Sequence, residues 1–340
     1  MRAIAVTDAV GTVLCHDVTR IVPGAEKGPA FRKGHIIRSE DIPALLAIGK
    51  EHIYILDLSP GMLHENEAAE RMARAAAGAG IRFTPVSEGK VNLVAQGDGL
   101  LKINAEGLRH VNAIEGVVFG TLHTHRTIVA GSPVAGTRVI PLVIEEDKIR
   151  QVEALCQRHR PLVEVKPFRP WTIGMITTGS EVYHGRIADK FGPVVREKFA
   201  ALGSTVVEQI LVSDDQAMTV AAIHRLIAAG AEMVVATGGM SVDPDDQTPA
   251  SIRAAGGTVV TYGAPVFPGA MFMLAYIGRV PVLGLPGCVM YSRATIFDLI
   301  VPRLLAGETV CRDEVIALGH GGLCPACPAC RYPQCGFGRG

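Results

Sequence analysis

Residues 233–249 decide the fold: Met233-Val234-Val235-Ala236-Thr237-Gly238-Gly239-Met240-Ser241-Val242-Asp243-Pro244-Asp245-Asp246-Gln247-Thr248-Pro249. The first four residues are apolar, and two of them are β-branched, which is typical of a buried strand. The adjacent glycines that follow permit backbone turns that other residues resist. The stretch therefore predicts a buried strand that ends in a polar, glycine-containing loop.

The same pattern repeats on both sides of this stretch. Strands are predicted at 172–176, 205–211 and 280–283, and helices at 193–202, 216–229 and 291–305. Strands that alternate with helices are the signature of an α/β fold in which helices cover both faces of a mainly parallel sheet. We therefore predict a three-layer α/β/α domain over residues 171–308.

Polar loops follow the four predicted strands. They contain Thr178, Gly179, Ser180 and Glu181; Asp214 and Asp215; Gly238, Gly239, Ser241 and Asp246; and Pro286, Gly287 and Cys288. Ligands of open α/β sheets bind at the carboxyl ends of the strands. Glycines let backbone N–H groups approach an anion, and carboxylates hold Mg²⁺ together with substrate phosphates. The loops therefore predict a site for a phosphate-bearing heterocycle with a metal, although each loop alone could be an ordinary turn or helix cap.

These loops resemble the molybdopterin-binding domain shared by molybdopterin adenylyltransferases, molybdopterin molybdotransferases and competence-damage-inducible A-type proteins. The matching motifs are Thr237-Gly238-Gly239-x-Ser241-Val242, Asp246-x-Thr248-Pro249, Thr178-Gly179-x-Glu181, Ile187-x-Asp189, Ser213-Asp214-Asp215 and Leu285-Pro286-Gly287. The resemblance implies that the loops bind molybdopterin or its adenylylated form. It also implies that Glu181, Asp214 and Asp246 are catalytic, and that Glu181 and Asp246 hold Mg²⁺.

The front half is similar, at residues 11–18 and 31–49, to the molybdotransferase body. That similarity implies insertion of molybdate into adenylylated molybdopterin, with release of AMP. However, the family's Lys-Pro-Gly-Lys-Pro is Phe267-Pro268-Gly269-Ala270-Met271 here, so two cations that would attract the molybdate dianion are missing. Three functions stay open: this enzyme, a non-catalytic carrier that delivers the pterin to a molybdoenzyme, and a nucleotide-pyrophosphate hydrolase of the competence type.

Composition bounds the rest of the chain. A length of 340 residues suits two or three domains, and a hydrophobic fraction of 48% is enough to form a buried core. We predict an α+β region at 1–80 and a small β-rich domain at 81–168. Lys+Arg and Asp+Glu both number 33, which argues against a nucleic-acid binder. Neither a signal peptide nor a membrane-spanning run is recognisable, so we expect a cytoplasmic protein without membrane contact. The resemblance implies a homo-oligomer.

Four of the eight cysteines lie in a tail at 320–340, namely Cys324, Cys327, Cys330 and Cys335. Thiols at these gaps can wrap Zn²⁺ in a Cys₄ site. The C-x₂-C-x₂-C run also fits the spacing of a [4Fe–4S] cluster. The tail is therefore predicted to bind a metal or contact a partner, the alternative being a disordered tail with free thiols.

His123 and His125 would share one face if their segment were a strand. A metal site there lacks a third ligand nearby in the sequence. We therefore expect a solvated or hydrogen-bonded pair of imidazoles.

Overall fold

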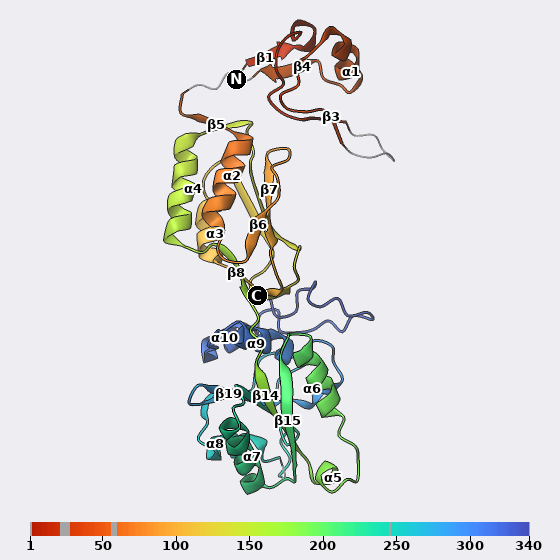
Figure 1. Cartoon of the computed structure of the whole chain (residues 1–340), viewed down its shortest axis with the longest axis vertical. Helices are drawn as coiled ribbons and strands as arrows, with labels where there is room; N and C mark the ends of the chain where they lie inside the picture. The colour runs from red at the N-terminus through yellow and green to blue at the C-terminus, as the bar shows by residue number, and fades with distance from the viewer. Residues whose placement is uncertain (1, 21–27, 56–59, 245, 340) are drawn as a thin grey trace. The chain divides into compact units, whose positions relative to one another are not determined.

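The computed structural model describes residues 2–20, 28–55, 60–244 and 246–339, so Asp245 of the deciding stretch lies outside the described residues. The chain divides into two compact units (Figure 1). The described residues of unit 1 lie in Met1–Gly97, Leu101–Thr124 and Val129–Val165, and those of unit 2 in Asp98–Leu100, His125–Ile128 and Lys166–Gly340. The four domain ranges given above stay predictions.

Unit 2 is built on a six-stranded sheet in the order β15-β14-β16-β19-β18-β17. Its strands are β14 (Thr172–Thr178), β15 (Thr205–Val212), β16 (Met233–Thr237), β17 (Thr258–Tyr262), β18 (Met273–Ile277) and β19 (Val280–Leu285). The first four strands in the sheet order are parallel, whereas β18 and β17 run antiparallel to their neighbours. The prediction of a mainly parallel sheet is therefore confirmed.

Helices cover both faces of this sheet. They are α5 (Ser180–Tyr183), α6 (Phe191–Ala200), α7 (Gln216–Ala228), α8 (Thr248–Ala254), the 3₁₀ turn η3 (Gly287–Met290), α9 (Ile296–Leu305) and α10 (Arg312–Ala317). One core packs α6 and α9 against side chains such as Met175 and Val235, and a second core packs α7 and α8 against Ile176 and Val234. Because neighbouring strand residues point to opposite faces, these two cores establish the predicted three layers.

Unit 2 differs from the predictions in several places, among them the unpredicted helices α8 and α10. The helix predicted at 291–305 begins at Ile296 rather than at Tyr291, because Thr295 and Asp298 form a capping box that fixes the helix start. The antiparallel pair β17 and β18 was not predicted at all. Its strands follow one another through a loop that contains Phe267, without a helix between them to mark them as separate strands.

Unit 1 combines several small sheets with helices. Its elements are β1 (Arg2–Ala5), η1 (Val6–Asp8), β2 (Val18–Arg20), β3 (Gly28–Phe31), η2 (Ser39–Asp41), α1 (Ile42–Ala47), β4 (His52–Ile55), β5 (Met62–His64), α2 (Glu65–Ala76), β6 (Ile81–Phe83), β7 (Lys90–Ala95), α3 (Ala105–Asn112), β9 (Val117–Thr121), β11 (Pro133–Val139), β12 (Val143–Glu145) and α4 (Glu146–Arg158). Strands β6-β7-β11-β9 form an antiparallel sheet that α2 packs against. Three further strands, β8 (Gly99–Ile103), β10 (Arg126–Ile128) and β13 (Val163–Pro167), contain or adjoin the points where the chain passes between the units. The predicted α+β and β-rich character of the front half is confirmed.

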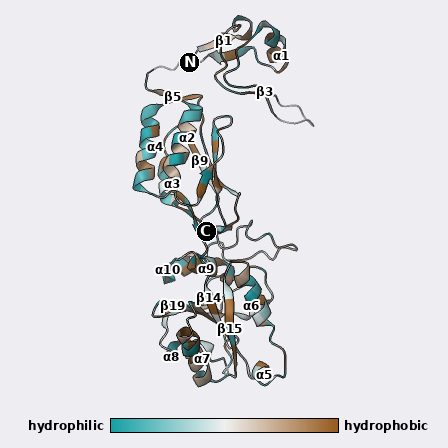
Figure 2. Cartoon of the chain, viewed as in Figure 1, coloured by the Kyte–Doolittle hydropathy of each residue, from teal (hydrophilic) through white to brown (hydrophobic). Residues whose placement is uncertain are grey.

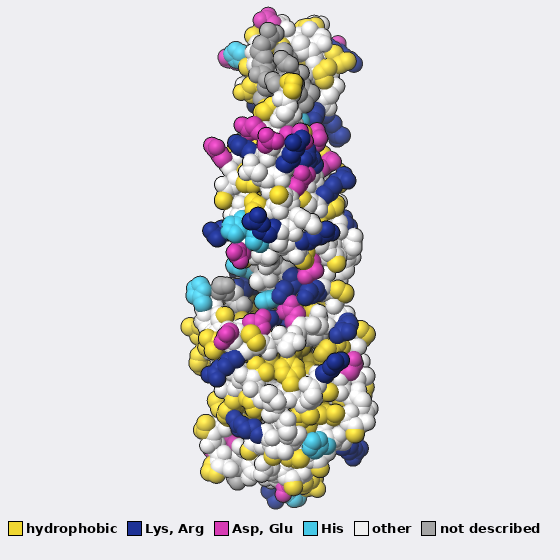
Figure 3. Space-filling view, turned by 90° about the vertical axis from the view of Figure 1, so that its left-hand side faces the viewer, with side chains coloured by type: hydrophobic (Ala, Val, Ile, Leu, Met, Phe, Trp, Pro, Cys, Tyr) yellow, Lys and Arg dark blue, Asp and Glu magenta, His cyan; other side chains and the backbone are white. Residues whose placement is uncertain are grey.

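The surface agrees with the balanced composition. Helices α2 and α4 are hydrophilic along much of their length (Figure 2). Figure 3 shows acidic and basic side chains interspersed on the face that it displays. Within the ranges that the structure describes, no helix combines the length and the apolar character that crossing a membrane requires.

The packing of β14 against α7 yields a stability prediction. A Cβ atom on Gly174 would lie 2.9 Å from the Leu226 Cβ atom and 3.0 Å from both of its methyl carbons. The Gly174→Ala variant should therefore lower the free energy of unfolding by about 1–3 kcal/mol through overpacking. Gly336→Ala is the matched control, since no atom lies within 4 Å of the added methyl group. Urea unfolding checks both, and equal midpoints for the two variants would contradict the close approach.

Candidate functional site

The loops at the strand ends of unit 2 surround two cavities of about 570 and 540 Å³. The two cavities share the lining residues Phe191, Gly238, Gly239, Asp243 and Asp246, so together they form one strand-end cleft. Loops after β14, β15 and β16 line the first cavity, and loops after β16 and β19 line the second. The cleft is therefore where the general rule for α/β sheets places a ligand.

The floor of the cleft depends on a close approach between the ends of β14 and β16. Gly238 has a φ of +85°, and a Cβ atom there would lie 2.3 Å from the Thr178 carbonyl oxygen. The Thr178 hydroxyl donates to the Thr237 carbonyl oxygen at 3.3 Å, and the Thr248 hydroxyl donates to the Gly238 carbonyl oxygen at 2.9 Å. Glycine is therefore required at position 238, because any side chain would push the two strand ends apart.

The three carboxylates predicted to be catalytic line the same cavity. Asp214 accepts a hydrogen bond from the Ser180 backbone N–H at 2.8 Å, and Asp246 accepts one from the Asp243 backbone N–H at 3.3 Å. Glu181 is exposed. Across the described residues, no three His, Cys, Asp or Glu side chains are grouped so that they could hold a metal ion. A Mg²⁺ ion would therefore need phosphate oxygens of a ligand beside Glu181 and Asp246, which are hard donors suited to it.

Two predicted binding residues do not line the cleft. Asp215 is exposed and caps α7, because its carboxylate accepts from the Met218 backbone N–H at 2.8 Å. Ser180 contributes its backbone N–H to Asp214 and is not part of either cavity wall. The remaining predicted binding residues, Thr178, Gly179, Gly238, Gly239, Ser241, Pro286, Gly287 and Cys288, all line one of the two cavities or both.

Asp189 lines the cleft, although the motif that contains it predicted no role for this residue. Its carboxylate accepts from the backbone N–H groups of Phe191 at 2.9 Å and Gly192 at 3.0 Å, and from the Gln209 side-chain amide at 2.5 Å. The same Gln209 amide donates to the Thr177 hydroxyl at 3.0 Å. Asp189 therefore fixes the start of α6 to β14 and β15. The Ile187-x-Asp189 motif is the sequence feature that could have indicated this role.

The second cavity has little positive charge around it. Its lining includes Phe267 and Ala270, the positions at which the resembled family has lysines, and it includes no Lys, Arg or His among the described residues. Phe267 is 57% exposed. Burial raises the pKa of the Cys288 thiol above its usual value, so this side chain is a neutral thiol at pH 7.

The tail folds back onto unit 2 beside this cavity. Phe267 donates its N–H to the Gly322 carbonyl oxygen at 2.7 Å, and Cys324 donates its N–H to the Phe267 carbonyl oxygen at 2.7 Å. Phe337 is buried in the core that contains α9. The alternative of a disordered tail is therefore not what this structure shows.

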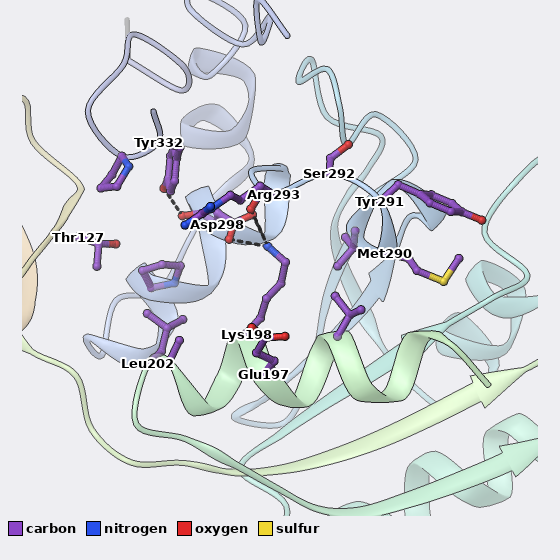
Figure 4. A pocket seen from close by; sticks show the side chains of 15 residues that line it. Thr127, Glu197, Lys198, Leu202, Met290, Tyr291, Ser292, Arg293, Asp298 and Tyr332 are labelled. Carbon is purple, nitrogen blue, oxygen red and sulfur yellow. Dashed lines mark hydrogen bonds and ion pairs between the residues drawn. The ribbon is translucent and has the colours of Figure 1, made fainter. Parts of the chain in front are cut away.

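A further cavity of about 630 Å³ lies next to the cleft and shares Met290 and Tyr291 with it (Figure 4). Lys198 reaches into it, but its ammonium group donates to both carboxylate oxygens of Asp298, at 2.8 and 3.0 Å, and to the Arg293 carbonyl oxygen at 3.0 Å. Because this cation is already paired inside the fold, the strand-end cleft is the better candidate site.

The predicted histidine pair does not lie on a strand. His123 and His125 fall in the segment between β9 and β10, and His125 has a φ of +60°. The two imidazoles therefore do not share the face of a strand, which was the arrangement considered for a metal site.

Comparisons with known proteins match the part of the chain that contains the strand-end cleft. Residues 174–306 match the model of a family described as "Probable molybdopterin binding domain", and residues 3–57 match a domain of unknown function. A molybdopterin adenylyltransferase of Pyrococcus furiosus is 34% identical over 85 residues, which cover 25% of this chain and 50% of that protein. A CinA-like protein of Mycobacterium sp. (strain JLS) is 33% identical over 79 residues, which cover 23% of this chain and 19% of that protein.

A molybdopterin molybdenumtransferase of Synechococcus elongatus is 24% identical over 185 residues, which cover 52% of this chain and 45% of that protein. The chain thus spans half or less of the length of these three relatives. Among solved structures, the molybdopterin biosynthesis enzyme MoaB of Thermus thermophilus matches with a TM-score of 0.34 and 21% identity, over 41% of this chain and 98% of that one. The predicted resemblance is confirmed for this part of the chain: residues 174–306 carry a domain of the family described as the probable molybdopterin binding domain.

Proposed function

We propose that this protein binds molybdopterin in the strand-end cleft and serves molybdenum cofactor biosynthesis. The observation that carries the proposal is the convergence of loops from four strands on one cleft within residues 174–306. The names of the adenylyltransferase and the molybdenumtransferase among the relatives support the ligand class. The cytoplasmic location and the homo-oligomer expected from the sequence are part of this proposal.

The cleft offers distinct surfaces to the two ends of such a ligand. In the first cavity, the glycine backbone after β16 and the Lys190 ammonium group suit a phosphate. Phe191 and Phe267 line the second cavity and suit the flat face of a pterin. Mg²⁺ held between Glu181, Asp246 and the phosphate would neutralise charge that the two carboxylates would otherwise repel.

A carrier is the form of this function that the second cavity favours. Insertion of molybdate would bring a dianion to a wall that contains Phe267 and Ala270, and the described lining residues offer no cation to hold it. A carrier needs to bind only the pterin and its phosphate. Hydrolysis of a nucleotide pyrophosphate is the remaining candidate, and the CinA-like relatives are what supports it.

Binding should depend on Mg²⁺ and on Asp246. Molybdopterin isolated without oxygen is expected to bind the full chain with Mg²⁺ present, and pterin fluorescence reports the binding. The Asp246→Asn variant should weaken this binding about tenfold, equivalent to about 1.4 kcal/mol, because one oxygen ligand of the metal loses its charge. With the metal removed by a chelator, the natural chain should lose its advantage over the variant, because Asp246 then only repels the phosphate.

Asp313→Asn is the control for that measurement, because Asp313 is an exposed acid in the first turn of α10 and does not line the cleft. It should bind as the natural chain does. Molybdopterin that fails to bind the natural chain would contradict the proposal. Equal binding by Asp246→Asn in Mg²⁺ would contradict the metal role.

Release of AMP separates a carrier from a molybdate-inserting enzyme. Adenylylated molybdopterin incubated with the chain, Mg²⁺ and molybdate should give no AMP above a metal-free control, because the second cavity lacks a cation for molybdate. Chromatography of the nucleotides measures this directly. AMP that appears with the natural chain and disappears with Asp246→Asn would instead support the enzyme and the role expected for Asp246, and would contradict the carrier.

A further inference from the structure

The four cysteines of the tail line a single cavity. The cavity has a volume of about 220 Å³ and is lined by Cys324, Cys327, Cys330 and Cys335, together with residues that include Arg293, Arg331 and Phe337. Cys324 and Cys335 are half-buried against the core, whereas Cys327 and Cys330 are exposed. Four cysteines within twelve residues therefore border one space that is several times the roughly 30 Å³ share of one water molecule.

The cavity that these cysteines border is larger than a single zinc ion needs. Zinc holds four thiolates at about 2.3 Å each, which brings the sulfur atoms close together around one point. A cavity of about 220 Å³ has room for a larger body that four thiolates hold together. A cluster of four iron and four sulfide ions is such a body, and the C-x₂-C-x₂-C run has the matching spacing.

The charge around the cavity also suits an anion. Arg293 and Arg331 belong to its lining, and the described lining residues include no Asp or Glu. Four thiolates outweigh the positive charge of the iron–sulfur core, so the ligated cluster is negative overall. The guanidinium groups would then stabilise the ligated cluster.

The polypeptide around the thiols is held in place by the rest of unit 2. Cys324 is bonded through its N–H to the Phe267 carbonyl oxygen, and the Tyr332 hydroxyl donates to the Asp298 carbonyl oxygen at 2.8 Å. Phe337 is 1% exposed. The segment that carries the cysteines is therefore anchored at its beginning, middle and end, which reduces the conformational entropy lost when the thiols bind a common ligand.

We propose that Cys324, Cys327, Cys330 and Cys335 bind a [4Fe–4S] cluster in this cavity. On transfer from a thiolate-ligated donor, each cysteine thiol replaces one donor thiolate on an iron ion, so one Fe–S bond forms as another breaks. The proton of the cysteine leaves with the released thiolate as a free thiol. The iron and sulfide ions arrive already in their final oxidation states when a preformed cluster is transferred, so the step needs no oxidant or reductant. The cluster would lie beside the Phe267 loop, which lines the pterin cleft, but its assembly does not depend on the proposed pterin binding.

Transfer of a preformed cluster to the metal-free full chain, without oxygen, tests the proposal. A synthetic [4Fe–4S] cluster with small thiolate ligands is the donor, and the repurified chain is expected to hold about four iron and four sulfide ions with broad visible absorption. The double variant Cys327→Ser, Cys330→Ser should hold less than about one iron per chain. Both side chains are exposed, so circular dichroism and the thermal midpoint before loading should stay unchanged.

Cys311→Ser is the matched control, because Cys311 is an exposed cysteine of the same unit that does not line the cavity. It should load as the natural chain does. Full loading of the double variant would overturn the proposal. So would a chain that takes up about one Zn²⁺ through these four cysteines and excludes the cluster.

Discussion

The candidate site depends on how closely the ends of β14 and β16 approach each other. A Cβ atom at Gly238 would lie 2.3 Å from the Thr178 carbonyl oxygen, and one at Gly239 would lie 2.8 Å from the Thr248 hydroxyl oxygen. These distances leave room only for glycine, so the loop after β16 lies directly against the end of β14. The carboxylates of both loops then border one cavity. The function proposed for the chain rests on this contact more than on any single charged residue.

Much of the domain could be predicted from the sequence because its strands are buried. Apolar runs such as Met233–Ala236 have no polar face, which identifies them as buried strands. The glycines and acids in the loops after them indicate a ligand site by their residue types alone. The predicted start of the last predicted helix, at Tyr291, was wrong for a local reason. Tyr291 to Ala294 suit a helix by composition, but the capping box of Thr295 and Asp298 sets the start of the helix at Ile296.

Other parts of the site could not be predicted, because they depend on contacts between distant segments. Asp189 acts through backbone N–H groups and through Gln209, which belongs to a different strand. The antiparallel strand pair that carries the Phe267 loop follows no helix–strand alternation. The cysteine spacing of the tail was visible, but no residue pattern indicated that Gly322 and Cys324 would bond to Phe267. Such pairings are tertiary, so sequence periodicity does not report them.

Asp298 joins three parts of unit 2 at one residue. Its carboxylate accepts from the Thr295 backbone N–H at the start of α9 and from the Lys198 ammonium group of α6, while its carbonyl oxygen accepts from Tyr332 in the tail. Groups that share a hydrogen-bonding partner do not contribute independently to the free energy of folding. Helix capping, the pairing of α6 with α9 and the docking of the cysteine segment are therefore thermodynamically coupled. A change in any one of them alters how much the other two contribute to the free energy of folding.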